Sequence, residues 1–216
     1  MVYSARGDEY NWRVGFAPTT IAFLLLIPLV SGQPSLRITS PRDGTLVHPG
    51  ESISIKVEAV GKFQQVAVIG WDPIGSDGPL SAPPYNFKIT VPRVINPGKY
   101  SLTATGFTGP GKPIDSEPIL LIVEFPDQPM AFKVQPSLLR LSIGEKGYLL
   151  SYGVFPDGLR AYLEKSDLIS FASGNPKVAT VDHRGVVTAL NPGSTTIKVS
   201  YRDSHVEIPL TVLADK

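Results

Sequence analysis

Cysteine is absent from this chain of 216 residues, and its net charge is only +1. Without cysteine there is no disulfide, thiol nucleophile, zinc–thiolate site or lipidated cysteine anchor. Because 20 basic residues are balanced by 19 acidic ones, the composition carries no electrostatic footprint for nucleic acid. Any fold must be held by core packing, and a content of 42% hydrophobic against 18% charged residues favours such a core over disorder.

A long helical period is also missing from Ser35 onward, whereas 21 prolines and 20 glycines are present. Alternation with a period of two replaces it. Over Ser52–Ala59 the apolar residues fall on one face and the polar residues on the other, as in a half-buried strand. Turn sequences separate such segments. The pattern predicts an all-β protein made of many short strands.

The expected strands fall into two sets. The first set comprises Leu36–Thr39, Ser52–Ala59, Gln65–Ile69, Tyr85–Val91, Lys99–Thr105 and Ile119–Glu124. The second set comprises Ala131–Gln135, Leu139–Ile143, Tyr148–Phe155, Leu168–Ala172, Val178–Val181, Val186–Ala189, Thr195–Tyr201 and Val206–Val212. Pro209 lies inside the last of these strands, and because proline cannot donate to a ladder we expect it at an edge or a bulge.

A short connector separates the two sets. Phe125-Pro126-Asp127-Gln128-Pro129 contains two prolines and predicts a stiff, extended segment. Roughly seven short strands on each side of it are typical of an immunoglobulin-type sandwich. We therefore predict two tandem immunoglobulin-like β-sandwiches, at residues 33–125 and 131–216, with a linker at 126–130.

The N-terminal segment has the features of an export signal. Ile21–Val30 is an apolar run, and Val30 and Gly32 fit the small or modest side chains of a signal-peptidase site. We interpret residues 1–32 as a signal peptide, which predicts an exported protein (periplasmic, cell-surface or secreted) with no membrane span after cleavage. The alternative is an uncleaved anchor over Val14–Val30, which lies at the lower edge of a membrane span and is interrupted by two prolines.

An Asn-Pro-Gly turn occurs in both sets. Asn96-Pro97-Gly98 and Asn191-Pro192-Gly193 each precede an alternating strand near the end of their set, which favours a repeated module over a common turn. Tyr100 follows the first of these turns, at the position of a tyrosine corner, in which the hydroxyl bonds back to nearby backbone. The alternative is an ordinary half-buried strand tyrosine.

An ordered pattern runs through the second set, in the segments Ser173–Asp182, Gly185–Leu190, Pro192-Gly193 and Thr196–Val199. With it, the chain from Asp157 to Tyr201 resembles the bacterial immunoglobulin-like domains of group 2, found in intimin- and invasin-like surface proteins. Phe171 stands where that family usually has a large aromatic residue, and we expect it to fill a core. The first set is similar, more loosely, to another bacterial immunoglobulin-like module. The resemblance implies binding, spacing or adhesion and brings no catalytic residues.

No group of residues converges on a catalytic site. His48, His183 and His205 belong to no ligand-spaced motif, and we expect all three at the surface. Asp203-Ser204-His205 contains the residue types of a hydrolase triad, but neighbours on a strand cannot point at one reacting atom. Asp72–Gly78 is a candidate calcium loop, but it has few acids for a calcium cage, and the favoured expectation is that its aspartates cap turns. We predict no enzyme, catalytic residue, cofactor or metal, and a secreted hydrolase is the least favoured alternative.

Trp71 and Tyr85 are the residues that we single out as a possible ligand platform. Their rings could stack on the face of a sugar, and the alternative for both is core packing. The leading hypothesis is an exported, non-enzymatic binding, adhesion or structural protein made of two immunoglobulin-like domains. Its partner would be a protein or glycan at the cell surface. The alternative function is a carbohydrate-binding module that uses Trp71 and Tyr85.

Overall fold

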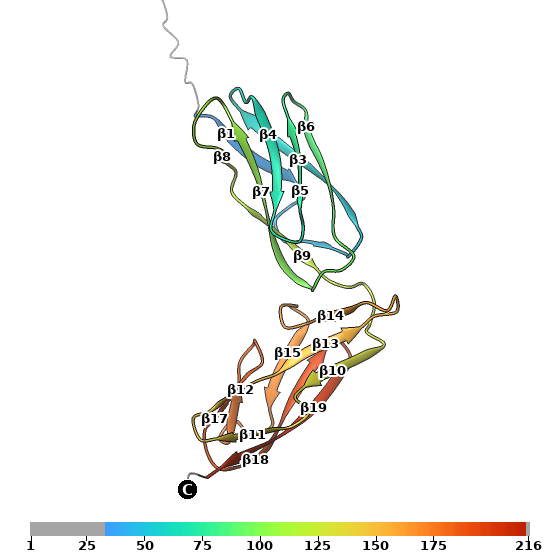
Figure 1. Cartoon of the computed structure of the whole chain (residues 1–216), viewed down its shortest axis with the longest axis vertical. Helices are drawn as coiled ribbons and strands as arrows, with labels where there is room; N and C mark the ends of the chain where they lie inside the picture. The colour runs from blue at the N-terminus through green and yellow to red at the C-terminus, as the bar shows by residue number, and fades with distance from the viewer. Residues whose placement is uncertain (1–32, 215–216) are drawn as a thin grey trace, which may run out of the picture. The chain divides into compact units, whose positions relative to one another are not determined.

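Two sets of strands follow each other along the chain, each around its own hydrophobic core (Figure 1). The computed structural model describes residues 33–214, and every regular element in this range is a β-strand. No helix in this part of the chain has the length and apolar character that crossing a membrane requires. The predicted signal peptide, residues 1–32, lies outside the described residues.

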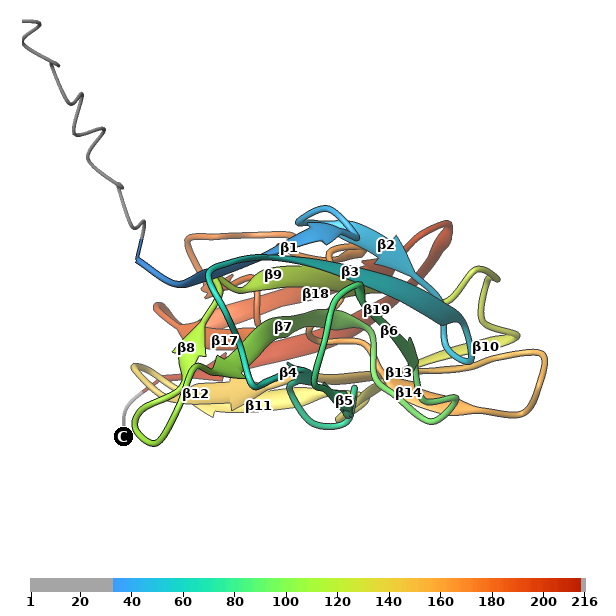
Figure 2. The same cartoon turned by 90° about the horizontal axis from the view of Figure 1, so that it is seen from above.

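The first set forms a sandwich of two sheets. One has the order β1-β3-β6 and contains β1 (Ser35–Ser40), β3 (Ser52–Val60) and β6 (Tyr85–Thr90). The other has the order β2-β9-β7-β4-β5 and contains β2 (Thr45–Val47), β9 (Ile119–Val123), β7 (Gly98–Phe107), β4 (Gln65–Gly70) and β5 (Ser76–Leu80). The short β8 (Ile114–Asp115) pairs with β7. Seen from above, β3 and β7 lie in separate layers (Figure 2).

The second set is a sandwich of three ladders. The first, in the order β10-β13-β14, contains β10 (Ala131–Gln135), β13 (Leu150–Val154) and β14 (Arg160–Tyr162). The second, in the order β11-β19-β18-β15, contains β11 (Leu139–Ser142), β19 (Ser204–Leu213), β18 (Gly193–Tyr201) and β15 (Ile169–Ser173). The third, in the order β12-β17-β16, contains β12 (Lys146–Tyr148), β17 (Val186–Ala189) and β16 (Ala179–Val181).

The cores follow from the alternation in the sequence. In β3 the residues Ile53, Ile55 and Val57 are buried, while the polar residues between them are exposed. Fully burying an aliphatic side chain of this size stabilises a fold by about 1.5–3 kcal/mol. The second sandwich has a similar core, and a smaller cluster surrounds the connector, made of Phe125, Phe155, Ala161, Leu163 and Tyr201.

The predicted fold class, two tandem immunoglobulin-like β-sandwiches, is confirmed, and each expected strand overlaps an observed one. Pro209 was expected at a strand edge or a bulge because proline has no backbone N–H to donate, and it lies at such an edge. Although β19 runs between β18 and β11, its ladder with β11 begins only at Leu210, so β19 has a free edge at Pro209. Sequence patterns missed the short strands β2, β5, β8 and β14, and the one strand expected over Tyr148–Phe155 is divided between the end of β12 and β13. The domain boundaries at residues 125, 126, 130 and 131 stay predictions.

The Asn-Pro-Gly turn is repeated in backbone conformation as well as in sequence. Gly98 and Gly193 have φ angles of +147° and +146°, and each is the first residue of a long strand. Tyr100 forms the expected corner, because its hydroxyl donates to the carbonyl oxygen of Asn96 at 2.7 Å. Partial burial of the ring raises the pKa of Tyr100.

Candidate functional site

The two aromatic residues predicted as a ligand platform lie at opposite ends of β4. Trp71 directly follows β4 and is 74% exposed, whereas Tyr85 is 6% exposed and belongs to the first core. β5 runs antiparallel to β4, and its last residue, Leu80, pairs with Val66 near the start of β4. The chain has therefore passed back to the start of β4 before it reaches Tyr85. The structure therefore does not bring the pair together. Tyr85 takes the core role that was its alternative, and only Trp71 offers an exposed ring.

In the loop from Asp72 to Gly78, Asp77 bonds to backbone groups. Its two carboxylate oxygens accept hydrogen bonds from the N–H groups of Gly78 and Lys88, each at 2.8 Å. The bond to Gly78 is the local cap that the sequence predicts for Asp77, whereas the bond to Lys88 joins the loop to β6. Within residues 33–214, no three side chains of histidine, cysteine, aspartate or glutamate gather as metal ligands.

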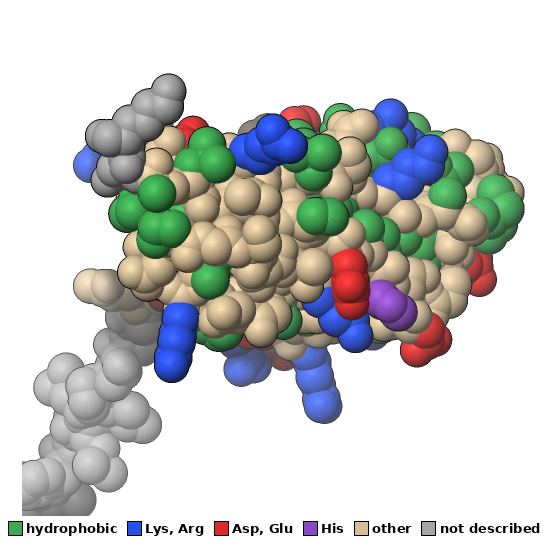
Figure 3. Space-filling view, turned by 90° about the horizontal axis from the view of Figure 1, so that it is seen from below, with side chains coloured by type: hydrophobic (Ala, Val, Ile, Leu, Met, Phe, Trp, Pro, Cys, Tyr) green, Lys and Arg blue, Asp and Glu red, His purple; other side chains and the backbone are tan. Residues whose placement is uncertain are grey.

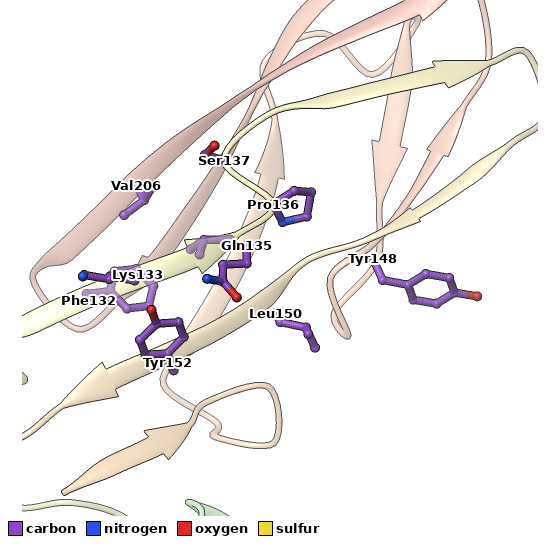
Figure 4. Close-up of a pocket in the computed structure, with 10 residues that line it drawn as sticks. Phe132, Lys133, Gln135, Pro136, Ser137, Tyr148, Leu150, Tyr152 and Val206 are labelled. Atoms are coloured by element: carbon purple, nitrogen blue, oxygen red, sulfur yellow. The ribbon is translucent and has the colours of Figure 1, made fainter.

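An open hollow of about 980 Å³ lies beside β10 in the second sandwich (Figure 4). Its lining includes the consecutive residues Phe132–Ser137, which form β10 and the turn after it. Figure 4 shows Val206 of β19 on one side of β10, and Tyr148, Leu150 and Tyr152 on the other. β10 is the last strand of its sheet and pairs only with β13, while β19 lies close to it on the other side, so residues of β13 and β19 line the hollow together with those of β10.

The side chains around this hollow are mostly apolar or aromatic, and two of them project strongly. Tyr148 is 65% exposed and Leu150 is 51% exposed. Lys133 is the one charged residue in the lining. Tyr148 and Leu150 come from two strands, β12 and β13. Exposed aromatic and aliphatic residues gathered at one place are characteristic of binding surfaces.

Tyr152 is held in place by its neighbours across the sheet. Lys133, Tyr152 and Tyr162 form one cross-strand row. The Tyr152 and Tyr162 rings meet edge to face at 6.4 Å, and the Arg160 guanidinium lies 3.6 Å from the centre of the Tyr152 ring. A cation–π contact of this kind contributes about 0.5–1 kcal/mol at an exposed site. The wall of the hollow is therefore preformed.

Glu124, at the start of the connector, is the only buried carboxylate in residues 33–214 and is 4% exposed. Its side chain accepts hydrogen bonds from the hydroxyls of Ser166 and Tyr201, at 2.5 and 3.4 Å. Burial raises the pKa of Glu124, although those bonds, a backbone bond from Asp167 and the charge of Arg202 oppose the shift. The junction, meaning the connector and the parts of both sandwiches that contact it, therefore contains a buried carboxyl group. Burial of that group is tolerated only because its hydrogen-bond partners are present.

The β18–β19 hairpin holds the connector from the other side. Arg202 at its tip has a φ of +51°, a conformation that favours glycine. Its guanidinium donates to the carbonyl oxygen of Phe125, and Asp203 accepts a bond from the Gln128 side chain at 2.7 Å. The Phe125 ring stacks on Phe155 with their centres 3.8 Å apart. Phe125 and Gln128 thus attach the connector to the second sandwich.

The first Asn-Pro-Gly turn also contacts the second sandwich. The side-chain oxygen of Asn96 accepts a bond from the Tyr162 N–H at 2.9 Å. Lys99 pairs with Asp167 at 3.0 Å, and a Cβ on Gly98 would lie 3.0 Å from the Cβ of Lys165. The same turn that forms the tyrosine corner therefore supplies contacts at the junction.

The histidines differ from expectation at one position. His183 and His205 are exposed, as predicted. His48 is half-buried, and its Nδ1 lies 2.8 Å from the carbonyl oxygen of Glu124, so it belongs to the junction rather than to the open surface. On the face drawn in Figure 3, basic and acidic side chains are interspersed rather than gathered by sign.

Sequence reasoning missed Glu124, Arg202 and the tyrosines beside β10 as functional candidates. The sequence feature that could have indicated a buried Glu124 is its position as a single acid between the apolar strand Ile119–Val123 and Phe125. The tyrosines gave none, because Tyr152 and Tyr162 belong to different strands and meet only through strand pairing.

Comparisons with known families agree with this architecture. Residues 34–104 match the family described as "Bacterial Ig domain", and residues 168–203 match "Intimin, immunoglobulin-like domain". One match falls in each sandwich. The chain therefore carries tandem bacterial immunoglobulin-like domains, and the resemblance noted in the sequence is confirmed. No curated protein matches the chain.

Solved structures show more distant likenesses. Fibronectin(III)-like modules of CbhA from Clostridium thermocellum are 28% identical, over 41% of this chain and 93% of that chain, with a TM-score of 0.34. Domains 1–6 of the surface layer protein SbsC are 16% identical, over 85% of this chain and 28% of that chain, with a TM-score of 0.37. Extracellular domains 3–5 of Drosophila OTK are 15% identical, over 83% and 66%, with a TM-score of 0.39.

Proposed function

We propose that the protein is an exported, non-enzymatic binding, adhesion or structural protein that meets a protein or glycan partner at a cell surface. The observation that carries this proposal is the hollow beside β10, where Tyr148 and Leu150 are exposed on the strands of an immunoglobulin-like sandwich. Tyrosine is enriched at protein interfaces because its ring is large, stiff and amphipathic.

In this proposal the connector positions the binding surface. Glu124 and Phe125 are buried against the second sandwich. The Arg202 guanidinium donates a hydrogen bond to the carbonyl oxygen of Phe125, directly before the first proline of the connector. Such a hydrogen bond restricts the conformation of the connector in addition to the restriction that its prolines impose. The connector therefore limits how freely the two sandwiches move. Binding would then depend on preformed surfaces, which lowers the entropy lost on association.

An array of glycans and extracellular proteins tests the proposal. We expect the full chain to be retained by at least one array component, and Tyr148→Ala to weaken retention by about tenfold, as for an interface hot spot. Tyr148→Phe is the matched control, since it keeps the ring. Failure of the chain to bind any component would count against a binding role.

Carbohydrate binding through the first sandwich is a second candidate, favoured by the 74% exposure of Trp71. An exposed indole can stack on the apolar face of a sugar ring. On the same array, this candidate predicts glycan signals that Trp71→Ala abolishes and Tyr148→Ala leaves unchanged. The two variants therefore separate the two surfaces.

A further inference from the structure

We propose that the outer face of the sheet β2-β9-β7-β4-β5, in the first sandwich, binds the same face of a second copy of this chain. Such a contact goes beyond the proposed function, which concerns the hollow in the second sandwich. It is supported by the apolar residues that the strand register places together, by the contrast with the other sheet, and by the balance of charge on the face.

The strand register places exposed apolar side chains side by side. Leu46 in β2 pairs with Ile122 in β9. Leu120 in β9 pairs with Ser101 in β7. The N–H of Trp71, directly after β4, donates to the carbonyl oxygen of Ser101 at 2.9 Å and so continues the pairing of β4 with β7. Because paired residues of neighbouring strands point to the same side of a sheet, these residues form two adjacent cross-strand rows.

A third row extends the face towards the middle of β4. It consists of Ile69 in β4 and Thr103 in β7, which pair with each other. The three rows thus contain five large apolar residues, which we call the apolar face: Leu46, Ile69, Trp71, Leu120 and Ile122. Four of them are exposed, and Ile122 is half-buried. Apolar residues that are contiguous and exposed in this way mark interaction sites on soluble proteins.

The outer face of the other sheet in the same sandwich is polar. Its exposed alternate residues in β3 and β6 are Ser52, Ser54, Lys56, Glu58, Asn86, Lys88 and Thr90. That composition is typical of a strand surface in contact with water. The apolar face instead has the composition of a sheet that packs against another sheet.

The charge on the apolar face suits a second copy. Lys99 in β7 pairs with Ile122 and is the one charged residue in the three rows, and its ammonium group lies 3.0 Å from the Asp167 carboxylate. In a twofold dimer, which is the commonest form of oligomer, each patch meets its own copy. A patch with an unbalanced charge would repel its copy. Because the Lys99 charge is balanced, two copies can meet here without such repulsion.

A glycan would gain less from this face. The Trp71 ring can stack on a sugar, but the other four residues of the apolar face are aliphatic and offer no hydrogen bond to sugar hydroxyls. Against a second sheet, the same aliphatic side chains would interdigitate as they do between the two layers of a sandwich.

The size of the apolar face limits the strength of the contact. Four strands about 4.8 Å apart and three rows about 6.8 Å apart, with their side chains, extend over about 20 Å in each direction. Burying such a face on both copies removes about 1,000 Å² from water in total, which is near the lower limit for a specific interface. We therefore expect a reversible dimer with a dissociation constant in the micromolar range.

Dimerisation through this face would double the number of binding hollows. None of the residues that line the hollow beside β10 belongs to the apolar face. A dimer would therefore present two hollows, and two linked sites are retained more strongly than one on a surface that repeats the partner.

Sedimentation equilibrium of the exported chain tests the proposal. The average mass is expected to rise from that of a monomer to twice that value between micromolar and near-millimolar concentrations. Leu120→Glu places a charge within the apolar face and is expected to weaken dimerisation by about tenfold or more. Ser54→Glu places the same charge on the polar face of the other sheet, so it is the matched control and should dimerise like the parent chain.

Trp71 provides an independent measurement of the same contact. Because Trp12 lies in the predicted signal peptide, Trp71 is the only tryptophan of the processed chain. Its fluorescence emission is expected to shift to shorter wavelength as the dimer forms, since the exposed indole leaves water. Leu46→Glu should abolish both this shift and the rise in mass. It takes the place of Leu120→Glu if near-ultraviolet circular dichroism shows that the latter does not fold.

The possible results distinguish this proposal from the proposed function. A chain that stays monomeric at near-millimolar concentration overturns the dimer. A dimer that both glutamate variants leave intact also overturns it, because the contact would then lie on another face. A monomer whose glycan signals disappear in Trp71→Ala would assign the apolar face to a sugar, with the same consequence. A dimer of the expected behaviour that no array component retains supports the contact while the proposed binding function fails.

Discussion

At the scale of single residues, Glu124 shows what burial does to a carboxyl group. Its side chain is enclosed by the cluster around Phe125 and Tyr201 and is bonded to the Ser166 hydroxyl. Burial is the largest influence on the group and raises its pKa above the ordinary value of 4.5. The folded chain therefore binds a proton at Glu124 more tightly than the unfolded chain does.

The sign of the resulting pH dependence follows by linkage. Because the folded pKa is raised, the contribution of Glu124 to stability is complete below the unfolded value of 4.5 and declines as pH rises through the folded pKa. We expect Glu124→Gln to lack this decline, as measured by urea unfolding at a series of pH values from 4 upward. The exposed Glu117→Gln should keep the pH profile of the parent chain. Parallel profiles for the parent and Glu124→Gln would contradict the assignment.

The tyrosine corner gives a second prediction at this scale. Tyr100→Phe removes the hydroxyl that bonds to Asn96, and we expect the free energy of unfolding to fall by about 1 kcal/mol, the net worth of one hydrogen bond. The measurement is chemical denaturation. Tyr148→Phe, on an exposed ring, is the control and should change stability by less than about 0.5 kcal/mol. Equal stability of Tyr100→Phe and the parent would remove the corner.

Single residues were also where sequence reasoning was least sufficient. Period-two alternation identifies Ile53 and Ile55 as core residues, but it does not say whether an isolated aromatic residue is buried. The exposures of Tyr85 and Trp71 differ because Tyr85 begins a core strand whereas Trp71 occupies a turn. Such a difference depends on the packing of distant strands.

At the scale of elements, the hairpin between β16 and β17 depends on Gly185. Its φ is +78°, and a Cβ there would lie 3.0 Å from the Leu149 carbonyl oxygen and 3.0 Å from the Phe171 ring. The loop sequence Asp182-His183-Arg184-Gly185 is typical of a hairpin in which the glycine takes a positive φ. It did not predict that the missing side chain also makes room for Phe171, which is half-buried and packs against the second core.

Gly185→Ala should therefore destabilise the second sandwich by more than backbone strain alone. Strain in the left-handed region amounts to about 1–3 kcal/mol, and the contacts with Leu149 and Phe171 add to it. Gly158→Ala isolates the strain, because Gly158 has a φ of +80° and nothing within 4 Å of the added Cβ. Thermal unfolding of both variants gives the comparison. Equal losses would mean that the hairpin accommodates the methyl group.

Strands could be predicted from the sequence where one face is buried and the other is exposed to solvent. β3 and β18 have a buried and a solvated face and alternate accordingly. β5 and β14 were missed because they are short and contain turn-like or charged residues, and pairing with β4 and β13 defines them. The place of β10 at the end of its ladder was beyond the sequence for a similar reason, since the order of strands in a sheet depends on which distant segments pair.

At the scale of the whole molecule, the connector joins the two cores. Phe125 is 4% exposed and stacks on Phe155, while its backbone carbonyl accepts the bond from Arg202. We expect Phe125→Ala to destabilise the second sandwich by about 3–5 kcal/mol through the cavity that it leaves. Phe107→Ala is the control, because that ring is 39% exposed. Urea unfolding followed by near-ultraviolet circular dichroism should reveal the loss, and an unchanged transition for Phe125→Ala would show that the connector packs elsewhere.

The central claim is that these two sandwiches act outside the cytoplasm by binding rather than catalysis. Cell fractionation followed by N-terminal sequencing of the product tests it most directly. We predict an extracytoplasmic product that begins at Gln33, after removal of residues 1–32. A cytoplasmic product that retains Met1 would contradict the proposed location and, with it, the cell-surface partner.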